Sequence, residues 1–515
     1  MKFSHFASII SGGVVLILGA ILIPIFNYIL PIELAKSLTL KDNTKGLTAW
    51  EHPMDTSDAY ITFYVFDVQN PNDVLQGAKP VLVEKGPYVY YAGKYRTDVE
   101  FEPNGTVYFR APRTMVFDKS KSKGSENDTF TTINVPLYTI MTMIKNHPVA
   151  DVIFGEGLKL FPNITMFKNL TVYEILWGYE DPILKTIKDI LDALPVPLNL
   201  PIKIDGYFGF FYQKNNTDTG LFNVNTGKNG MKDFMFINSW NKETHVPYWK
   251  SEYCNRINGT DGQVYHPFVD KAKRMYMFVS DLGRSIYLTY KKGVELEGIP
   301  LYRFTPPPEL WMYEDHPENE CFCVGDVCPH PGALNISACQ GGAPVFVSLP
   351  HFLYGDYYRG LVEGMKPSQE AHDTYIDVEK TSGIVMEGSK RIQLNLAVER
   401  IEHIVETKNL STLLFPVIWL DQSANINEKG IKQFKQELFY LQISIPIVAY
   451  CLIAIGSLFF LLGVIILIVR KQRSRRLRAS SADAKLVDEN SPLLSDDGAS
   501  TSSTASLSRP DNVAA

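Results

Sequence analysis

Two long apolar stretches, one near each end of the chain, constrain the fold more than any other feature of the sequence. They run from Ile9 to Leu30 and from Ile443 to Val469, and neither contains Asp, Glu, Lys, Arg or His. About 20 apolar residues in a helix cross the hydrocarbon core of a bilayer, which is roughly 30 Å thick. The sequence therefore predicts transmembrane helices over 9–30 and 443–469, with residues 31–442 between the two anchors.

Charge sets the orientation of the predicted spans. The second span is followed directly by six Lys or Arg residues within 470–478, and such clusters mark the cytosolic side of a membrane. Both termini are then cytosolic, with a short tail of residues 1–8 and a longer tail of residues 470–515. A cleaved signal peptide is the alternative for the first span, but its apolar core is longer than the about 7–15 residues usual for one. An uncleaved anchor is favoured.

The segment between the spans is predicted to lie in the lumen or outside the cell. All eight Asn-x-Ser/Thr sequons and five of the six cysteines fall within it, which is typical of a compartment that glycosylates and oxidises. Its net charge is −9 in a chain of −6, which argues against nucleic acid as a partner. The asparagines predicted to carry glycans are Asn104, Asn127, Asn163, Asn169, Asn215, Asn258, Asn335 and Asn409.

Strand signals dominate this ectodomain. The predicted strands are short, rich in β-branched or aromatic residues and bounded by turn residues; they cover 61–68, 80–91, 106–110, 206–212, 285–290, 343–349 and 391–401. Antiparallel pairing is expected, because helical patterns do not alternate with the strands. The exception is 135–194, which has a helical pattern in which Asp181 and Pro182 are expected to begin an amphipathic helix. A further helix is expected around 431–441, leading into the second span.

A series of motifs in the ectodomain resembles the motifs of a known family. Between Trp249 and Arg400 they are CNRINGTDG, VSDLGRSIYLTY, GIPLYRF, CFC, VSLPHFLY and HDTYIDVEKTSGI, and outside this stretch EKGPYVY, EILWGYEDP, NNTDTGLFNVNTG and FPVIWLDQ. Each motif alone is weak, but their order and spacing resemble the class B scavenger receptor family. That family contains receptors for fatty acids and lipoproteins and also has a lysosomal member.

The resemblance implies a fold. It is that of an α+β membrane protein whose large, irregular antiparallel β-barrel-like ectodomain carries a helical cap and is anchored by two transmembrane helices. In this family a lipid-sized tunnel runs through the ectodomain towards the bilayer, and the insert at 135–194 matches the cap farthest from the membrane. An enclosed apolar conduit would keep a lipid chain out of water, at about 0.8 kcal/mol per CH₂. Composition alone favours a solid core, so the tunnel is an expectation from the resemblance.

The lumenal cysteines allow two interpretations. The closely spaced candidates are Cys321, Cys323, Cys328, His330 and Cys339. Zinc ligation is one interpretation, but disulfide bonding is favoured in an oxidising compartment, and no metal or other cofactor is expected.

The resemblance also implies which cysteines pair. It implies the disulfides Cys254–Cys321 and Cys323–Cys328. A third bridge of the family would join Cys339 to a position that holds Gly283 here. Cys339 is therefore expected to be unpaired or to compete for another pairing.

Candidate ligand residues come from the cap and the cytosolic tail. His147, Lys159 and Lys168 lie in the helical insert, where relatives carry lysines that attract anionic lipids; ordinary solvated lysines are the favoured interpretation, and a glycan on Asn163 would cover the area. For His147 a plain surface histidine is favoured over a response to lumenal pH. In the tail, Glu489, Leu493 and Leu494 resemble an acidic dileucine sorting signal read by clathrin adaptors, with a chance leucine pair as the alternative.

Together these features predict a glycoprotein of the lysosomal or late endosomal membrane. It would bind lipid, lipoprotein or a protein ligand at the cap and pass a fatty acid, sterol or ester through the ectodomain. The sequence contains no nucleophile elbow, zinc-binding helix or phosphate-binding loop, the motifs that would indicate an enzyme. The alternatives are a plasma-membrane receptor for lipoproteins, apoptotic cells or microbes, and a trafficking receptor for a lysosomal hydrolase. Ser8 and Gly12 have the spacing of small residues in packed membrane helices, a weak signal that keeps a homo-oligomer among the alternatives.

Overall fold

The computed structural model describes residues 3–145, 154–156, 164–193, 204–313, 316–325, 328–402 and 404–488. The chain divides into two compact units. One unit combines Met1–Asn27 with Gln442–Ala515, and the other is Tyr28–Leu441. The boundary between the units lies close to the borders of the apolar stretches.

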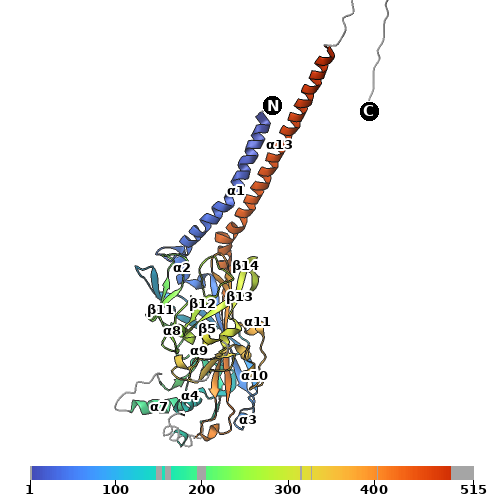
Figure 1. The fold of residues 1–515 in the computed structure, drawn as a ribbon. Helices are drawn as coiled ribbons and strands as arrows, with labels where there is room; N and C mark the ends of the chain where they lie inside the picture. Colours follow the sequence, from blue (N-terminus) through green and yellow to red (C-terminus); the bar gives the residue numbers. More distant parts are fainter. Residues whose placement is uncertain are drawn as a thin grey trace, which may run out of the picture. The chain divides into compact units, whose positions relative to one another are not determined.

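Two long helices build the first unit. They are α1 (Phe3–Leu38) and α13 (Tyr440–Asp488), and both are long and apolar enough to cross a membrane. Within the unit they run side by side (Figure 1). A Cβ atom added to Gly12 would lie 2.6 Å from the backbone nitrogen of Phe460, and one added to Gly456 would lie 2.4 Å from that of Leu16. Small residues thus let the two backbones approach closely, as in other membrane helix pairs.

The second unit is built on one antiparallel sheet, which has eleven strands within the described residues. Its main path is β12 (Met275–Val279), β13 (Arg284–Leu296), β14 (Ile299–Thr305), β17 (Tyr375–Glu379), β18 (Val385–Val398), β19 (Leu413–Ile426), β1 (Ser57–Val68), β2 (Leu82–Lys94) and β5 (Arg113–Phe117). The short strands β15 (Ala333–Asn335) and β16 (Val345–Ser348) branch from β18.

The first and last long strands of this unit are neighbours. β1 pairs with β19 from Ser57 opposite Ile426 to Val65 opposite Ile418. Phe63 and Val65 of β1 are fully buried, and Tyr64, which points to the other face, stacks on Trp419 with ring centres 3.9 Å apart. Alternate aromatic and β-branched side chains therefore fill apolar clusters on both sides of the strand pair.

Smaller elements complete the second unit. A four-stranded sheet and two two-stranded sheets contain β11 (Ile237–Trp240), β10 (Phe222–Asn225), β4 (Thr106–Arg110), β3 (Thr97–Phe101), β6 (Thr129–Ile133), β7 (Phe167–Thr171), β8 (Tyr179–Glu180) and β9 (Tyr207–Phe208). The helices are α2 (Lys45–Glu51), α3 (Pro71–Val74), α4 (Val135–Ile144), α6 (Val172–Trp177), α7 (Pro182–Asp192), α8 (Glu252–Asn255), α9 (Pro317–Glu320), α10 (Asp356–Arg359), α11 (Gln369–His372) and α12 (Glu428–Phe434). Single 3₁₀ turns lie at 53–55, 280–282, 308–311, 337–339, 350–352 and 405–407.

Most predicted strands are present, and two predictions need correction. The strands predicted at 61–68, 80–91, 106–110, 285–290, 343–349 and 391–401 overlap β1, β2, β4, β13, β16 and β18. The strand predicted at 206–212 is reduced to β9, two residues long. The insert at 135–194 is not helical throughout: Phe167–Thr171 forms β7, because its backbone pairs with β6.

Candidate functional site

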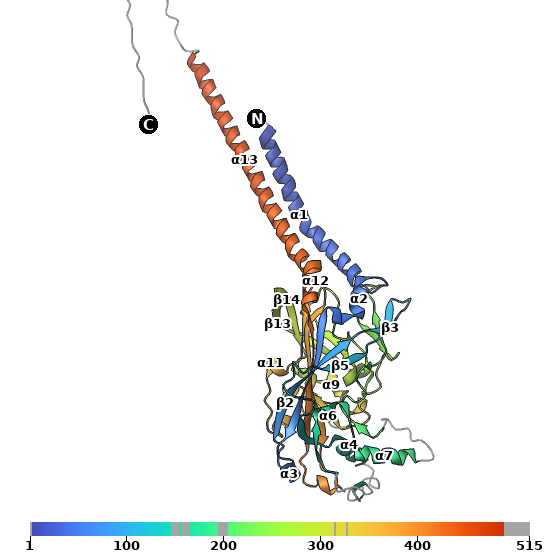
Figure 2. The ribbon, with the colours of Figure 1, turned by 180° about the vertical axis from the view of Figure 1, so that it is seen from behind.

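The predicted cap is a set of short helices attached to the two-stranded sheet of β6 and β7. We use the word cap for β6, α4, β7, α6 and α7. Helices α4 and α7 lie at one end of the second unit, opposite the end that holds α2 (Figures 1 and 2). Leu137, Tyr138 and Met141 of α4 are buried against the core. In α7 only Ile183 is fully buried, while Ile190 on its last turn is 58% exposed.

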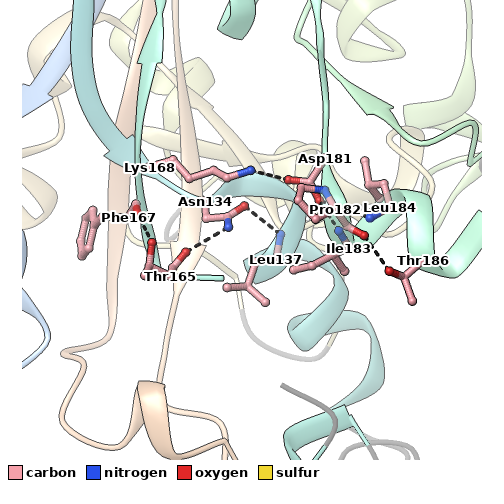
Figure 3. Close-up of polar contacts among 10 residues, drawn as sticks. All are labelled: Asn134, Leu137, Thr165, Phe167, Lys168, Asp181, Pro182, Ile183, Leu184 and Thr186. Atoms are coloured by element: carbon pink, nitrogen blue, oxygen red, sulfur yellow. Dashed lines mark hydrogen bonds and ion pairs between the residues drawn. The ribbon is translucent and has the colours of Figure 1, made fainter. Parts of the chain in front are cut away.

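Polar side chains at the base of the cap fix where its helices begin. Asn134 accepts a hydrogen bond from the backbone N–H of Leu137 (3.3 Å) and donates one to the carbonyl of Thr165 (3.0 Å) (Figure 3). The first contact caps α4, and the second ties it to the chain segment that enters β7. Asn134 thus joins two parts of the cap that lie 31 positions apart in the sequence.

Asp181 occupies the centre of this network. Its Oδ1 accepts hydrogen bonds from the N–H groups of Ile183 (3.0 Å) and Leu184 (3.2 Å), which caps α7 as the sequence predicted. Its Oδ2 lies 2.7 Å from Lys168 Nζ (Figure 3). The Asp181 side chain is fully buried and that of Lys168 is 20% exposed. The buried carboxylate therefore has both a backbone cap and a charge partner.

Lys168 has a further contact that explains its position. Its Nζ lies 4.5 Å from the ring centre of Tyr179, over the ring face. Burial, followed by the charge of Asp181, raises the pKa of the Tyr179 hydroxyl, so this ring remains neutral. Lys168 is therefore not a freely solvated charge but links β7 to the start of α7. A role in ligand contact stays a prediction.

The other predicted ligand and sorting residues fall outside the described part of the chain. In the cap these are His147, Lys159 and the sequon Asn163. In the tail they are Glu489, Leu493 and Leu494. Their predicted roles stand on the sequence alone.

The described sequons divide by exposure. Asn258 and Asn335 are only half exposed, and the exposed ones are Asn104, Asn127, Asn169, Asn215 and Asn409. The side chain of Asn215 is engaged although the residue is exposed, because it accepts from the N–H of Met115 (2.8 Å) and donates to its carbonyl (3.0 Å). Occupancy of these sites by glycans stays a prediction.

The structure contains both disulfides that the resemblance implied. Cys254 is bonded to Cys321, with Cα atoms 6.1 Å apart, and Cys323 to Cys328, with Cα atoms 5.0 Å apart. Four of the five lumenal cysteines are thereby consumed as disulfides, which removes the thiolates that the zinc interpretation requires.

Cys339 is a free thiol beside the glycine that replaces its family partner. A Cβ atom on Gly283 would lie 3.1 Å from the Cβ of Cys339. Burial raises the pKa of this thiol to about 11, so it stays protonated at neutral pH and is a poor nucleophile.

Four motifs meet at a polar cluster inside the main sheet. Glu84 of EKGPYVY lies 2.7 Å from His351 Nε2 of VSLPHFLY and accepts a hydrogen bond from Trp419 Nε1 (2.6 Å). The ring of His372, from HDTYIDVEKTSGI, stacks on that of His351. The sequence alone does not predict this cluster, since Glu84 lies 267 positions before His351; polar residues inside strand motifs were the available signal.

The ionisation of the cluster is set by its surroundings. Burial alone would raise the pKa of Glu84, but the hydrogen bonds from His351 and Trp419 together outweigh it and hold the pKa below its usual range. Burial, and then the neighbouring His351, lowers the pKa of His372 to about 4. Glu84 is therefore charged and His372 neutral at neutral pH.

Three further charged side chains of the second unit are partly buried and partly exposed. Burial lowers the pKa of Lys94 to about 8 and also lowers that of Lys390. Their side chains are 23% and 22% exposed. Asp281, which lies 3.3 Å from Lys390, has a half-exposed side chain. All three side chains therefore still contact solvent.

A small apolar cavity adjoins this charged group. Its volume is about 30 Å³. It is lined by residues of β13, β18 and the turn after β14, among them Leu282, Ile286, Trp311, Lys390 and Ile392. A cavity of this size holds about two water molecules but no lipid chain.

Comparison with known proteins adds an independent line of evidence. The CD36 family profile matches residues 10–467. Lysosome membrane protein 2 of Rattus norvegicus is 34% identical over 464 residues, which cover 89% of this chain and 92% of the relative. The Homo sapiens protein of the same name is 32% identical over 466 residues, 90% of this chain and 92% of the relative. Scavenger receptor class B member 1 of Cricetulus griseus is 33% identical over 459 residues, 87% of this chain and 86% of the relative.

Proposed function

The chain belongs to the CD36 family, and from that premise we propose a membrane glycoprotein that binds ligands at its cap and passes lipid through its ectodomain. The ligands at the cap are lipid, lipoprotein or protein, and the lipid passed to the bilayer is a fatty acid, a sterol or an ester. The protein acts as a receptor and carrier and performs no chemical step.

Membership of the CD36 family is the observation that supports lipid passage. The relatives include scavenger receptor class B member 1, which is similar over 87% of this chain. In the second unit, a small apolar cavity lies beside the partly exposed charged side chains of Lys390 and Asp281. A conduit for an amphipathic molecule needs both kinds of lining.

Mass spectrometry of co-purified lipids tests this proposal. Full-length protein is purified in detergent, and its bound lipids are compared with those of the same extract. We expect one lipid class to be enriched at near-stoichiometric amounts. Retention of no lipid class above its level in the extract would contradict the proposal.

A blocking variant ties that measurement to the interior. Ile392 lines the small cavity, and Ile392→Trp is expected to reduce the bound lipid. Val405, 68% exposed on the surface, provides the control Val405→Trp, which should retain it. Overpacking at buried Ile392 is expected to cost about 1–3 kcal/mol, so occupancy is compared at a temperature where both variants are folded, as checked by their unfolding curves.

We further propose that the protein resides in lysosomes or late endosomes. Two observations support this: relatives named lysosome membrane protein 2 cover nearly the whole chain, and the tail carries Glu489, Leu493 and Leu494 in a dileucine pattern. Leu493→Ala/Leu494→Ala should move the protein to the cell surface, measured by surface labelling of intact cells. The control Leu486→Ala/Val487→Ala should not.

The plasma membrane is the second candidate location. It is favoured by the similarity to scavenger receptor class B member 1, at 33% identity. Surface labelling decides between the two locations. Most of the wild-type protein at the surface, with no change in the dileucine variant, would establish the second.

A further inference from the structure

An open pocket of about 380 Å³ lies where the second unit leads into α13. Helix α12 continues through a π-helical turn, Lys435–Phe439, to Tyr440. Opposite these turns lies Glu297, between β13 and β14. In Figure 2, α12 lies at the same end of the unit as α2. The pocket is lined by Glu297, Glu428, Ile431, Lys432, Lys435, Gln436 and Tyr440.

The lining combines both signs of charge with one aromatic ring. Lys435 Nζ lies 3.4 Å from Glu297 Oε2, a long contact in which the glutamate is mostly exposed. Within the described residues, Lys432 and Glu428 take part in no ion pair. Two cations and two carboxylates thus surround one volume, and only one pair is in contact. A pocket of this size is in the range that holds small ligands.

The chain itself keeps this pocket close to a membrane surface. Tyr440 lies three positions before Ile443, where the apolar span begins, and Lys435 lies eight before it. At about 1.5 Å per residue, they are at most about 5 and 12 Å from the start of the span along the helix, whereas Lys432 and Glu428, eleven and fifteen positions before Ile443, are about 17 and 23 Å from it. The headgroup layer on each side of a bilayer is about 5–8 Å thick. The Tyr440 end of the pocket therefore lies at the headgroup layer, towards which the long side chains of Lys435 and Lys432 extend, while Glu428 is too far from it.

We propose that the pocket binds the headgroup of phosphatidylethanolamine from the bilayer that anchors the chain. Lys432 and Lys435 donate to the phosphate oxygens. Glu297 accepts a hydrogen bond from the primary ammonium, whose three N–H groups can donate, unlike a trimethylammonium, which has none. Tyr440 offers its ring face to the same cation.

The charge balance of the pocket favours a zwitterion over an anion. An anionic lipid would meet two lysines but also two carboxylates that it cannot satisfy. A zwitterionic headgroup pairs with both lysines and with Glu297. When it binds, Lys435 exchanges its long contact with Glu297 for the phosphate.

Photo-crosslinking of the full-length chain in nanodiscs tests this. The probe is phosphatidylethanolamine with a diazirine at the glycerol end of one acyl chain, diluted in phosphatidylcholine. We expect mass spectrometry to find label on the segment 428–440. Lys432→Glu/Lys435→Glu should reduce that label about tenfold, as expected for losing one charge-assisted hydrogen bond or more.

The helix offers a matched control. Lys429 is exposed on α12 and does not line the pocket. Lys429→Glu therefore changes the charge of the same helix and should leave the amount of label within about twofold of the wild type, a smaller change than the loss of one hydrogen bond causes. Lys432→Gln/Lys435→Gln is a milder second variant in case the reversal of charge prevents folding. Equal labelling of 428–440 in the pocket variants and the wild type would overturn the proposal.

Competition separates the sources of the headgroup. Unlabelled phosphatidylethanolamine should displace the probe, and phosphatidylglycerol should not. Displacement by phosphatidylglycerol, or equally strong displacement by soluble glycerophosphoethanolamine at the same amount, would overturn the assignment to a zwitterionic bilayer lipid. Labelling at this pocket does not depend on lipid passage, so its loss leaves the proposed function standing, and failure of lipid passage leaves the pocket intact.

Discussion

The imidazole rings of His351 and His372 stack face to face with their centres 4.4 Å apart. Each ring accepts a hydrogen bond from a backbone N–H at Nδ1: His351 from Lys366 (3.2 Å) and His372 from Ser368 (3.0 Å). The pKa of His372 is about 4, so this ring is neutral at neutral pH and its unprotonated Nδ1 is the acceptor; His351 Nε2 lies 2.7 Å from Glu84 Oε2. Protonation of either Nδ1 would break a backbone contact.

This arrangement predicts that acid destabilises the ectodomain. The pKa of His372 is about 4 in the folded chain and about 6.5 in an unfolded one. The unfolded chain therefore binds a proton first as the pH falls, and the stabilisation present above pH 6.5 is lost progressively towards pH 4. The melting temperature of the full-length protein should fall between pH 7.5 and pH 5.

A variant assigns that loss to the histidine. His372→Asn keeps an acceptor for the N–H of Ser368 but does not titrate, so its melting temperature should fall less over the same pH range. His52 is exposed, and His52→Asn should behave like the wild type. An unchanged pH dependence in His372→Asn would show that His372 is not responsible.

The second prediction concerns the ion pair at the base of the cap. Lys168→Met leaves the fully buried Asp181 without its charge partner, so we expect a loss of about 3 kcal/mol in the stability of the cap. Lys185 and Glu180 form a pair of similar length, 2.8 Å, but both are about half exposed. Lys185→Met should therefore have no measurable effect.

Hydrogen exchange of residues 164–193 measures both changes in the full-length chain. Faster exchange in Lys168→Met than in Lys185→Met is the expected result. If the two variants exchange alike, burial does not distinguish the pairs, and Asp181 is stabilised by its helix-capping contacts alone.

The third prediction concerns the helix pair of the first unit. Gly12 has no room for a side chain, since its Cβ would lie 2.6 Å from Phe460 N, whereas the Cβ of neighbouring Gly13 would meet only the Phe460 side chain at 3.9 Å. Gly12→Leu should separate the helices, and Gly13→Leu should be tolerated.

A thiol cross-linking reporter measures the separation. Ser8 Oγ lies 3.5 Å from the backbone carbonyl of Phe459, so Ser8→Cys/Phe459→Cys, in a Cys451→Ser background, should be joined by a short bifunctional thiol reagent, which does not need the strict Cβ geometry of a disulfide. The yield should fall with Gly12→Leu and persist with Gly13→Leu. Equal yields in both would show that Gly12 is not a contact that holds the helices together.

The fourth prediction restores the missing bridge of the family. Disulfide-bonded cysteines have Cβ atoms about 3.5–4.5 Å apart; a Cβ on Gly283 would lie 3.1 Å from that of Cys339 and 2.8 Å from the Tyr248 ring, so the Tyr248 side chain must shift to admit it. Gly283→Cys should therefore bond to Cys339. The backbone at Gly283 has φ of +58°, a conformation that strains other residues, so the gain in stability should be small.

Alkylation under denaturing conditions reads out this bond. The Cys339 peptide should be labelled in the wild type and in Gly283→Ser, and should be protected in Gly283→Cys until reductant is added. Labelling of Cys339 in unreduced Gly283→Cys would show that the two positions do not pair.

The sequence predicted those features that depend on short stretches of chain. The length of each apolar run was enough to place the helices over 9–30 and 443–469, and the Asp181–Pro182 pair was enough to place the start of α7. The disulfides followed from matching motifs to a family. Each of these depends on residues close together or on an ordered set of motifs.

Features that depend on distant partners were missed. Phe167–Thr171 is a strand only because β6, about 40 residues earlier, offers an edge for it to pair with. The meeting of Glu84, His351 and His372 depends on the register of four separate chain segments. Lys168 could not be assigned to Asp181 before β7 and α7 were placed.

The pairing of β1 with β19 has a consequence for how the protein is made. Residue 68 leaves the ribosome about 345 residues before residue 413, and at about 5–20 residues per second this is a delay of roughly 17–70 seconds. Throughout that interval one edge of β1 has no partner, so the nascent chain is open to mispairing. Quality control in the compartment of synthesis must therefore protect an almost complete polypeptide until its last lumenal strand arrives.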